Sequence, residues 1–229
     1  WYFGSECDGG FAQYTVVDSL HAYKINSIYS DVELASFPCS YSTAENMLYR
    51  SNPQQGQTVL ITGASGGVGS AAVQLAKARG ANVIAITSES KAQQLKDLGA
   101  DKVLSREDDL IKTLGKSSVD VVIDLVAGEQ WPKLLEVLKP KGRYAVSGAI
   151  GGALVELDIR TLYLKDLTFF GCTVIEPGVF KSLVSFIEQE KIKPIVAQTL
   201  PLSEIVTAQQ VFSQKLHVGK IVLTIPHSK

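Results

Sequence analysis

The stretch from Val59 to Gly80, VLITGASGGVGSAAVQLAKARG, has the residue types and spacing of a phosphate-binding turn. A glycine-rich segment there follows an apolar run and precedes a helical pattern. Glycines let the backbone approach a pyrophosphate, whose charge is stabilised by the amides and dipole at the start of the next helix. A branched side chain at Gly67 is therefore expected to occupy the place of the pyrophosphate. The residues assigned to this phosphate site are Gly63, Ser65, Gly66, Gly67 and Val68, with Gly69 completing the glycine set.

The same turn satisfies the G-x-S-x-G pattern of serine hydrolases, in which Ser65 would be the nucleophile. Asp166 and His217 could complete a triad in the order serine, aspartate, histidine. That fold places several strands before the nucleophile, whereas here the first parallel strand carries the motif, and no HGGG-type segment precedes it. A P-loop is excluded because no Gly-Lys-Ser/Thr follows the glycines. A tight turn without a ligand is the remaining alternative, and the agreement of strand, turn, helix and second strand argues against it.

The end of the second apolar run, NVIAITSESK, indicates which dinucleotide fits. An NAD site usually has Asp or Glu here, which binds the 2′-hydroxyl of the ribose. This chain has Thr87 and Ser88 instead, and Lys91 follows three residues later. Hydroxyls and a lysine suit a 2′-phosphate, which a carboxylate would repel, so Glu89 is expected to point outward. The sequence therefore favours NADPH over NADH.

Apolar, β-branched runs recur along the chain between amphipathic segments. Continuous apolar runs, rather than alternating ones, are typical of strands that are covered on both faces. Their alternation with helical patterns predicts an α/β fold with a doubly wound parallel sheet of the Rossmann type. Strands are expected at 58–62, 82–87, 101–104, 119–126, 142–148 and 167–174, and helices at 68–79, 91–98 and 131–138.

The pattern changes beyond Glu176. Helices are predicted to begin at Pro177-Gly178 and at Ser203, and the chain closes on a predicted strand, GKIVLTI. An alternating strand is predicted near the other end, at 11–17. We expect these segments to form a separate subdomain that joins the two ends of the chain in space.

Composition and charge exclude several classes of partner. The 229 residues carry a formal net charge of −1, which gives no sign of a nucleic-acid or anionic membrane partner, and no apolar run approaches the ~20 residues of a membrane span. Cys7, Cys39 and Cys172 form no CxxC pair, so a reducing compartment, by default the cytoplasm, is expected. Trp1 opens the chain and Met47 is its one methionine, so we interpret the chain as a fragment that lacks its natural N-terminus.

Segments spread over nearly the whole chain resemble the medium-chain dehydrogenase/reductase superfamily, in its alcohol dehydrogenase and quinone reductase branches. The most specific segment is GQTVLITGASGGVGSAAVQLAKARGANVIAIT, and the others are DGGFAQYTVV, FPCSYSTAENML, LGADKV, DVVIDLVAG, GRYAVSG and VGKIVLTI. The resemblance implies an NADPH-dependent oxidoreductase that transfers hydride between the nicotinamide and a carbonyl, a quinone or an activated alkene. A nucleotide-binding protein without turnover, a sensor or a structural protein, is the competing class, because fold alone does not fix function.

The resemblance also implies two domains, one of them a GroES-like catalytic domain that would be incomplete here. Residues 1–39 and 172–229 would be its remnant, and 40–171 the dinucleotide-binding domain. Thr43 would lie by the nicotinamide, and Thr43 and Lys220 are the implied catalytic residues. The other residues implied to line or close the cofactor cleft are Asp124, Gly148, Ala149, Phe170, Gly171, Cys172 and the Gly219-Lys220 pair.

Cys39 has two alternative interpretations. In the zinc-dependent branch, the cysteine of a segment like CSYST is a catalytic zinc ligand four residues before the threonine at the nicotinamide. A catalytic zinc takes three protein ligands, and the other two, a cysteine and a histidine, would lie upstream of Trp1. In the quinone reductase branch there is no metal, and Cys39 would be a small buried hydrophobic residue. We therefore assign no metal site within this chain and leave zinc open for the complete protein.

The run LTFFGCTV predicts how copies of the chain associate. It reads as the last strand of the sheet and is apolar throughout, with Lys165 and Asp166 guarding its start. A long apolar edge strand is an aggregation hazard unless something covers it. Pairing with the same strand of a second copy about a two-fold axis would cover it, and the resemblance implies dimers of this kind. We expect a homodimer through residues near 167–175.

Overall fold

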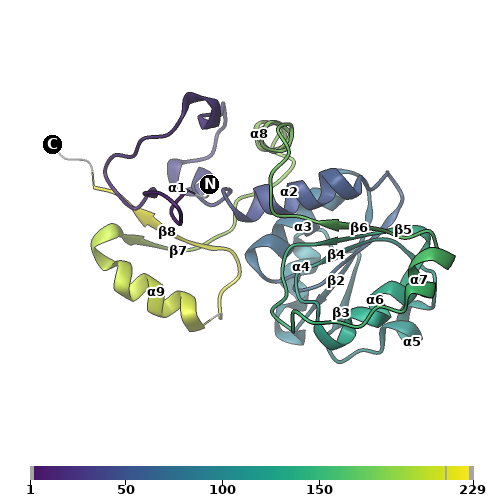
Figure 1. Ribbon diagram of the computed structural model, residues 1–229. Helices are drawn as coiled ribbons and strands as arrows, with labels where there is room; N and C mark the ends of the chain where they lie inside the picture. The colour runs from purple at the N-terminus through teal and green to yellow at the C-terminus, as the bar shows by residue number, and fades with distance from the viewer. Residues whose placement is uncertain (1–2, 215, 227–229) are drawn as a thin grey trace. The chain divides into compact units, whose positions relative to one another are not determined.

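The computed structural model describes residues 3–214 and 216–226, so Trp1 lies outside the described residues. The chain divides into two compact units (Figure 1). One unit is Pro38–Lys193 and holds the large sheet. The other combines Trp1–Phe37 with Pro194–Lys229.

The sheet of the larger unit has six parallel strands in the order β3-β2-β1-β4-β5-β6. The strand order reverses between β1 and β4, and in such sheets ligands bind at this point, outside the carboxyl ends of the strands. The predicted doubly wound sheet is confirmed. The strands are β1 Thr58–Ile61, β2 Asn82–Thr87, β3 Lys102–Ser105, β4 Val119–Asp124, β5 Leu138–Val146 and β6 Thr168–Gly171.

Helices cover both faces of this sheet (Figure 1). Neighbouring strand residues such as Val59 and Leu60 are both fully buried, which is why the strands read as continuous apolar runs. Helices α2 and α3 pack together on one face, and α5 and α6 pack together on the other. Helix α2 Ser40–Ser51 precedes β1, and the elements between the strands are α3 Gly67–Ala78, η2 Glu89–Lys91, α4 Ala92–Asp97, α5 Leu110–Leu114, η3 Gly128–Gln130, α6 Trp131–Val137 and α7 Ile159–Leu164.

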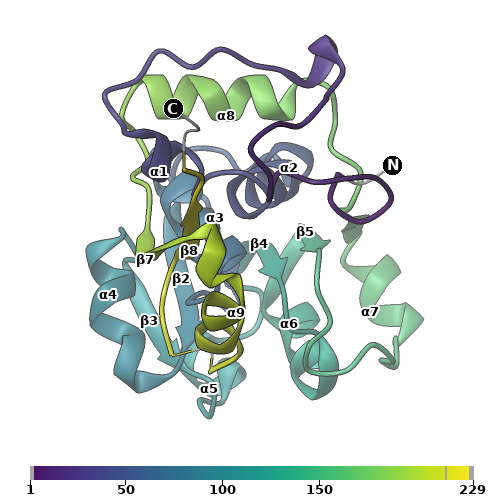
Figure 2. The ribbon, with the colours of Figure 1, turned by 90° about the vertical axis from the view of Figure 1, so that its left-hand side faces the viewer.

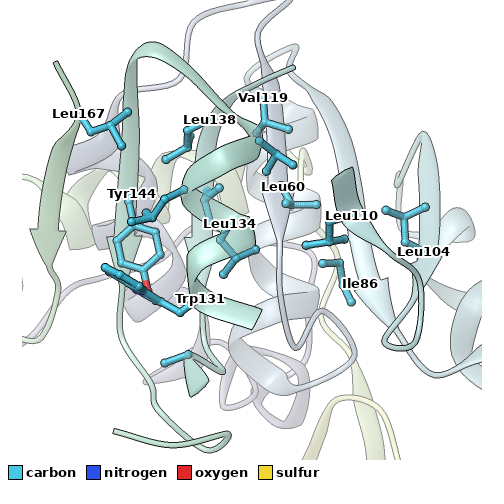
Figure 3. Close-up of a cluster of buried hydrophobic side chains, with 14 residues drawn as sticks. Leu60, Ile86, Leu104, Leu110, Val119, Trp131, Leu134, Leu138, Tyr144 and Leu167 are labelled. Carbon is cyan, nitrogen blue, oxygen red and sulfur yellow. The ribbon is translucent and has the colours of Figure 1, made fainter. Parts of the chain in front are cut away.

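Three aromatic rings pack together in the core, and Figure 3 shows two of them, Trp131 and Tyr144. Trp131 meets both Tyr144 and Phe169 edge-on at 6.0 Å between ring centroids, and Tyr144 and Phe169 lie 5.3 Å apart. Phe169 therefore belongs partly to the core of its own unit, although it lies on the edge strand β6. Substituting Phe169 would disturb the fold before it reported on any contact at the edge.

The sequence suggested that Lys165 protects the start of the edge strand, but in the structure its side chain points to α6. Its Nζ donates hydrogen bonds of 2.8 to 3.0 Å to the carbonyl oxygens of Leu135, Glu136 and Leu138. These carbonyls lie where α6 ends and have no partner within the helix. Lys165 caps that helix, and Asp166, at a positive φ of 49°, turns the chain into β6.

Helix α8, Val179–Glu188, belongs to the larger unit and not to the predicted C-terminal subdomain. Its buried Val179, Leu183 and Ile187 lie on one face, and the helix packs against α2 (Figure 2). The unit boundary consequently falls after Lys193, later in the chain than the 171/172 boundary expected from the sequence.

The smaller unit contains a two-stranded parallel sheet with a helical crossover. The helix near Ser203 and the closing strand are confirmed, but the strand predicted at 11–17 is wrong. No described residue pairs with that segment as a strand, and a strand needs a partner for its backbone groups. The elements are η1 Ser19–His21, α1 Asp31–Leu34, β7 Val196–Pro201, η4 Leu202–Glu204, α9 Ile205–Gln214 and β8 Lys220–Thr224. Within the described residues of both units, no helix has the length and apolar character needed to cross a membrane.

Candidate functional site

The glycine turn lies at the carboxyl end of β1, where the strand order reverses. Gly63 has a φ of +57°, and the Gly66 N–H donates to the Gly63 carbonyl at 3.0 Å, which closes the turn. A Cβ on Gly69 would lie 2.3 Å from the Gly63 oxygen. Glycine is therefore required for α3 to begin this close to the turn. No side chain caps the first turn of α3 at its N-cap, Gly66, so its amides can bind an anion.

Gly67 is constrained by a neighbouring part of the protein, the start of α2. A Cβ there would lie 2.6 Å from Oγ of Ser40, the first residue of α2. The glycine thus lets the starts of α2 and α3 pack against each other. A side chain at Gly67 would therefore require the Ser40 hydroxyl to move.

Ser65 lies in the turn with 7% of its surface exposed. The proposed triad partner Asp166 precedes the amino end of β6, whereas Ser65 follows the carboxyl end of β1. Because the strands are parallel, these residues lie at opposite ends of the sheet. His217 belongs to the smaller unit. The structure therefore contradicts the hydrolase triad.

We expect Ser65→Ala to keep most of the NADPH affinity, since the phosphates would be bound by backbone amides. A fluorophosphonate probe should leave the unmodified protein unlabelled. Fluorescence titration with NADPH and mass spectrometry after probe treatment measure these outcomes. Stoichiometric labelling at Ser65 would restore the nucleophile hypothesis.

The end of β2 carries a buried hydroxyl that lacks a partner. Thr87 is 1% exposed, and its Oγ1 makes no hydrogen bond within the described residues. The half-buried Ser88 and the 3₁₀ turn η2 follow, and η2 brings Lys91 back toward the strand end, while Glu89 is exposed as predicted. A buried unpaired hydroxyl is costly unless a ligand or water completes it. Together with the uncapped start of α3, it fits a dinucleotide phosphate ester.

Asp124, at the end of β4, is fully buried and its carboxylate is saturated by the protein. Oδ1 accepts hydrogen bonds from Thr62 Oγ1 at 2.5 Å and from the N–H groups of Val126 and Ala127 at 2.9 and 3.1 Å. Oδ2 accepts the Tyr144 hydroxyl at 2.6 Å. Burial, and then the nearby negative charge of Asp124, raise the pKa of Tyr144, so the phenol stays a donor. Asp124 acts by holding the 125–128 loop, in which Ala127 has a φ of +55°.

The loops that follow β5 and β6 are tied to one another and to the 125–128 loop. Gly148 passes so close to Leu125 that a Cβ would lie 2.7 Å from its carbonyl oxygen. Ala149 follows and is exposed. Ser147 Oγ donates to the carbonyl of Cys172 at 2.7 Å, and the Cys172 N–H donates to β5 at 2.9 Å. The structure thus brings the predicted residues that follow β4, β5 and β6 together at the carboxyl ends of these strands.

Arg50, which the sequence did not single out, holds the end of β6. Its guanidinium donates to the Gly171 carbonyl and lies 5.6 Å from the ring centroid of Phe170. Burial raises the pKa of the Cys172 thiol, although Arg50 acts in the opposite direction. Cys172, which is buried, is therefore a packing residue and not a reactive thiol.

Thr43 is half-buried in the first turn of α2, and Lys220 begins β8 in the smaller unit. Cys39, the N-cap residue of α2, is exposed, which differs from the burial expected for it in the quinone reductase branch. It has a φ of +66°, and the Ser40 N–H donates to the Pro38 carbonyl at 2.9 Å, which defines a strained γ-turn. Within the described residues, no three His, Cys, Asp or Glu side chains are grouped to hold a metal.

A cavity of about 190 Å³ opens between the ends of β1, β2, β3 and β4. Its wall is mainly apolar, with Ile86, Leu110 and Leu134 among the lining residues, and its polar members include Ser105, Arg106, Asp108 and Gln130. The sequence analysis did not predict these polar residues, because no motif marks the end of β3, where Ser105, Arg106 and Asp108 lie. Register was the available signal, since Thr87 pairs with Ser105 across β2 and β3.

Comparison with known proteins gives a consistent set of relatives. A family model described as zinc-binding dehydrogenase matches residues 67–189. The acryloyl-coenzyme A reductase of Metallosphaera sedula is 31% identical over 225 residues, which are 97% of this chain and 67% of the relative. An NAD-dependent alcohol dehydrogenase of Sulfurisphaera tokodaii is 31% identical over 232 residues, with 97% and 66% coverage. The chain thus spans about two thirds of the length of these curated relatives.

Solved structures agree with the sequence relatives. A protein of Sinorhizobium meliloti 1021 is 43% identical and superposes with a TM-score of 0.91, covering 98% of this chain and 64% of that chain. The 2-octenoyl-CoA carboxylase reductase CinF, in complex with NADP and 2-octenoyl-CoA, is 26% identical with a TM-score of 0.84, covering 94% and 54%.

Proposed function

Because the chain belongs to the medium-chain dehydrogenase/reductase superfamily, we propose that its protein is an NADPH-dependent oxidoreductase. It transfers hydride between the nicotinamide and a carbonyl, a quinone or an activated alkene. The observation that carries the choice of cofactor is the end of β2, where the buried, unpaired hydroxyl of Thr87 stands in place of a carboxylate. One similar protein was solved in complex with NADP and another is described as NAD-dependent, so both cofactors occur among the relatives.

Each part of the site has a task in this reaction. NADPH, when bound, supplies a hydride from its nicotinamide ring. The uncapped amides at the start of α3 bind the pyrophosphate, and Thr87, Ser88 and Lys91 bind the 2′-phosphate. The 125–128 loop, which Asp124 holds in place, and the loop after β5 line the nicotinamide side of the crevice and exclude water from it. Thr43 orients the nicotinamide from α2.

The smaller unit contains Lys220, one of the residues that the family resemblance implies as catalytic. We propose that it is part of a GroES-like catalytic domain and that Lys220 contacts the cofactor from β8. Cys39 remains the candidate zinc ligand, supported by its exposure and its strained γ-turn. The three free cysteines support a reducing compartment such as the cytoplasm.

Turnover is the direct test of the proposed activity. The protein should consume NADPH, followed by absorbance, with at least one acceptor from a panel of a quinone, an enone, an aldehyde and acryloyl-coenzyme A. NADPH that binds but is not oxidised by any acceptor would favour the non-catalytic alternative, a nucleotide-binding sensor or structural protein.

Lys91→Ala should weaken NADPH binding by about 1–3 kcal/mol, because it removes a charge-assisted bond to the 2′-phosphate. NADH has no such phosphate and should bind almost unchanged. The exposed Lys96 of α4 provides a matched control, Lys96→Ala, with no expected effect on either cofactor. Nicotinamide fluorescence titrations measure all four affinities. Equal losses for NADPH and NADH would remove Lys91 from the phosphate site.

The edge strand β6 supports a homodimer as part of the proposal. The order of strands places β6 last in the sheet, with β5 as its one partner. The Cys172 N–H points to β5, so the next N–H, that of the exposed Thr173, faces away from it. The strand ends at Gly171 and is shorter than the predicted 167–174, and after the Cys172 N–H no described backbone group up to residue 175 pairs with β5.

Sedimentation at micromolar concentration tests this assembly. We expect a dimer, and we expect Thr173→Pro to weaken it, because proline removes a backbone donor from the open edge. Thr173→Ser keeps the backbone N–H donor and is the matched control. A monomer, or a dimer that Thr173→Pro leaves intact, would contradict pairing through β6.

A further inference from the structure

Arg106 is a cation at the rim of the 190 Å³ cavity, directly after β3. Its side chain is exposed, and the structure shows no hydrogen bond or ion pair for it among residues 3–214 and 216–226. Two other arginines bind protein groups: Arg79 forms an ion pair with Glu45, and Arg50 donates a hydrogen bond to the Gly171 carbonyl. Arg106 is therefore available to a ligand.

The backbone beside Arg106 is held in a defined position. Asp108 Oδ2 accepts the Ser105 N–H at 2.8 Å, and the Glu107 N–H donates to Ser105 Oγ at 3.3 Å. These two bonds enclose Arg106 in a tight turn between β3 and α5. The backbone of Arg106 is consequently fixed in position, while its guanidinium can bind a ligand at the rim of the cavity.

Register brings Arg106 next to the proposed 2′-phosphate site. Thr87 and Ser105 are paired residues at the carboxyl ends of β2 and β3, and neighbouring strands are about 4.8 Å apart. Ser88 and Arg106 are the next residues on each chain segment. If the adenine base of the nucleotide enters the cavity that Ile86 lines, its ribose would lie between the carboxyl ends of β2 and β3.

Charge also favours a cation at this point. Asp108 lines the same cavity, and its carboxylate would repel a phosphate. Lys91, after β2, would be the single positive charge against the phosphate dianion. A guanidinium presents two parallel donors to a phosphate, which a lysine does not.

We propose that Arg106 is a specificity-determining residue that binds the 2′-phosphate of NADPH together with Lys91, one cation from each of two neighbouring strand ends. This rests on the proposed function and deepens it, because it makes discrimination against NADH depend on β3 as well as on β2.

The test measures binding of two nucleotide fragments, adenosine 2′,5′-bisphosphate and 5′-AMP, to the protein by isothermal titration calorimetry. Arg106→Ala should lower the affinity for the bisphosphate at least tenfold and change that for 5′-AMP by less than twofold. Arg106→Lys should recover part of the loss. Lys112→Ala removes an exposed positive charge from the adjacent helix α5 and serves as the control for a general change in charge.

Each of the following outcomes would overturn the proposal. Equal losses for both fragments would show that Arg106 stacks on the base, and no loss for either would show that it does not touch the nucleotide. If Arg106→Ala has no effect while the unmodified protein still prefers the bisphosphate, the NADPH assignment survives and this inference fails. If the unmodified protein shows no preference for the bisphosphate, the NADPH assignment fails and the inference fails with it.

Discussion

Replacing Gly69 by valine should destabilise the protein by about 3 kcal/mol and abolish measurable NADPH binding. A Cβ at this position would lie 2.3 Å from the Gly63 oxygen and 2.6 Å from the Ala64 Cα, which are backbone atoms that cannot rotate away. The start of α3 must then separate from the glycine turn, at the overpacking cost typical of a filled core position. Separation also moves the amides that would bind the pyrophosphate. Urea unfolding and NADPH fluorescence titration measure the two effects.

Gly66→Ala is the matched control within the same turn. Gly66 has a φ of −73°, which alanine adopts without strain, and its Cβ would meet no atom closer than the Gly63 oxygen at 3.4 Å. We expect this variant to lose less than about 1 kcal/mol of unfolding free energy, because alanine is only a poorer N-cap than glycine. Equal destabilisation by the two substitutions would contradict the close approach at Gly69.

Arg79→Met should cost about 3–5 kcal/mol of unfolding free energy, because it leaves the fully buried Glu45 without its counter-ion. Arg79 Nη2 lies 2.5 Å from Glu45 Oε1, and its guanidinium stacks 4.9 Å from the ring centroid of Phe186. Ser182 Oγ donates to the same carboxylate oxygen at 2.8 Å. One ion pair therefore joins α2 and the end of α3 to α8, which explains why α8 belongs to the sheet unit.

The double variant Glu45→Met/Arg79→Met distinguishes a lost charge partner from lost packing. Replacing both ions by apolar side chains of similar size is often neutral or stabilising. We expect the double variant to recover most of the stability that Arg79→Met loses, as measured by denaturant unfolding. If the double variant is as unstable as Arg79→Met alone, the uncompensated carboxylate is not the cause of the loss.

Local signals in the sequence were sufficient for the sheet and the phosphate turn. The turn needs glycines because α3 begins almost against Gly63, and Gly80 ends the same helix at a φ of +76°. Continuous apolar runs predicted strands that are covered on both faces, as Val59 and Leu60 show. These features depend on residues that are close in the chain, so a single sequence reveals them.

Features that depend on distant partners could not be predicted in this way. The buried Glu45 reads as an ordinary helix residue until Arg79 and Ser182 are seen beside it. The saturation of Asp124 depends on Thr62 and Tyr144, which lie on other strands. Arg106 gains its meaning only from the register of β2 with β3.

Two expectations from the sequence differ from the structure: the burial of Cys39 and a strand at 11–17. Burial of Cys39 was expected from one branch of the resembled family, and a strand at 11–17 from its alternating pattern. Tertiary context decides both, since Cys39 lies in a γ-turn before α2 and no described residue pairs with 11–17 as a strand.

The central claim is that the crevice at the ends of β1 and β2 binds NADPH in preference to NADH. Competitive titration of the two reduced cofactors against the unmodified protein, followed by nicotinamide fluorescence, tests it most directly. The site around Thr87, Ser88 and Lys91 predicts that NADPH binds at least tenfold more tightly, since a charge-assisted bond is worth about 1.5–3 kcal/mol. NADH binding that equals or exceeds NADPH binding would contradict the account.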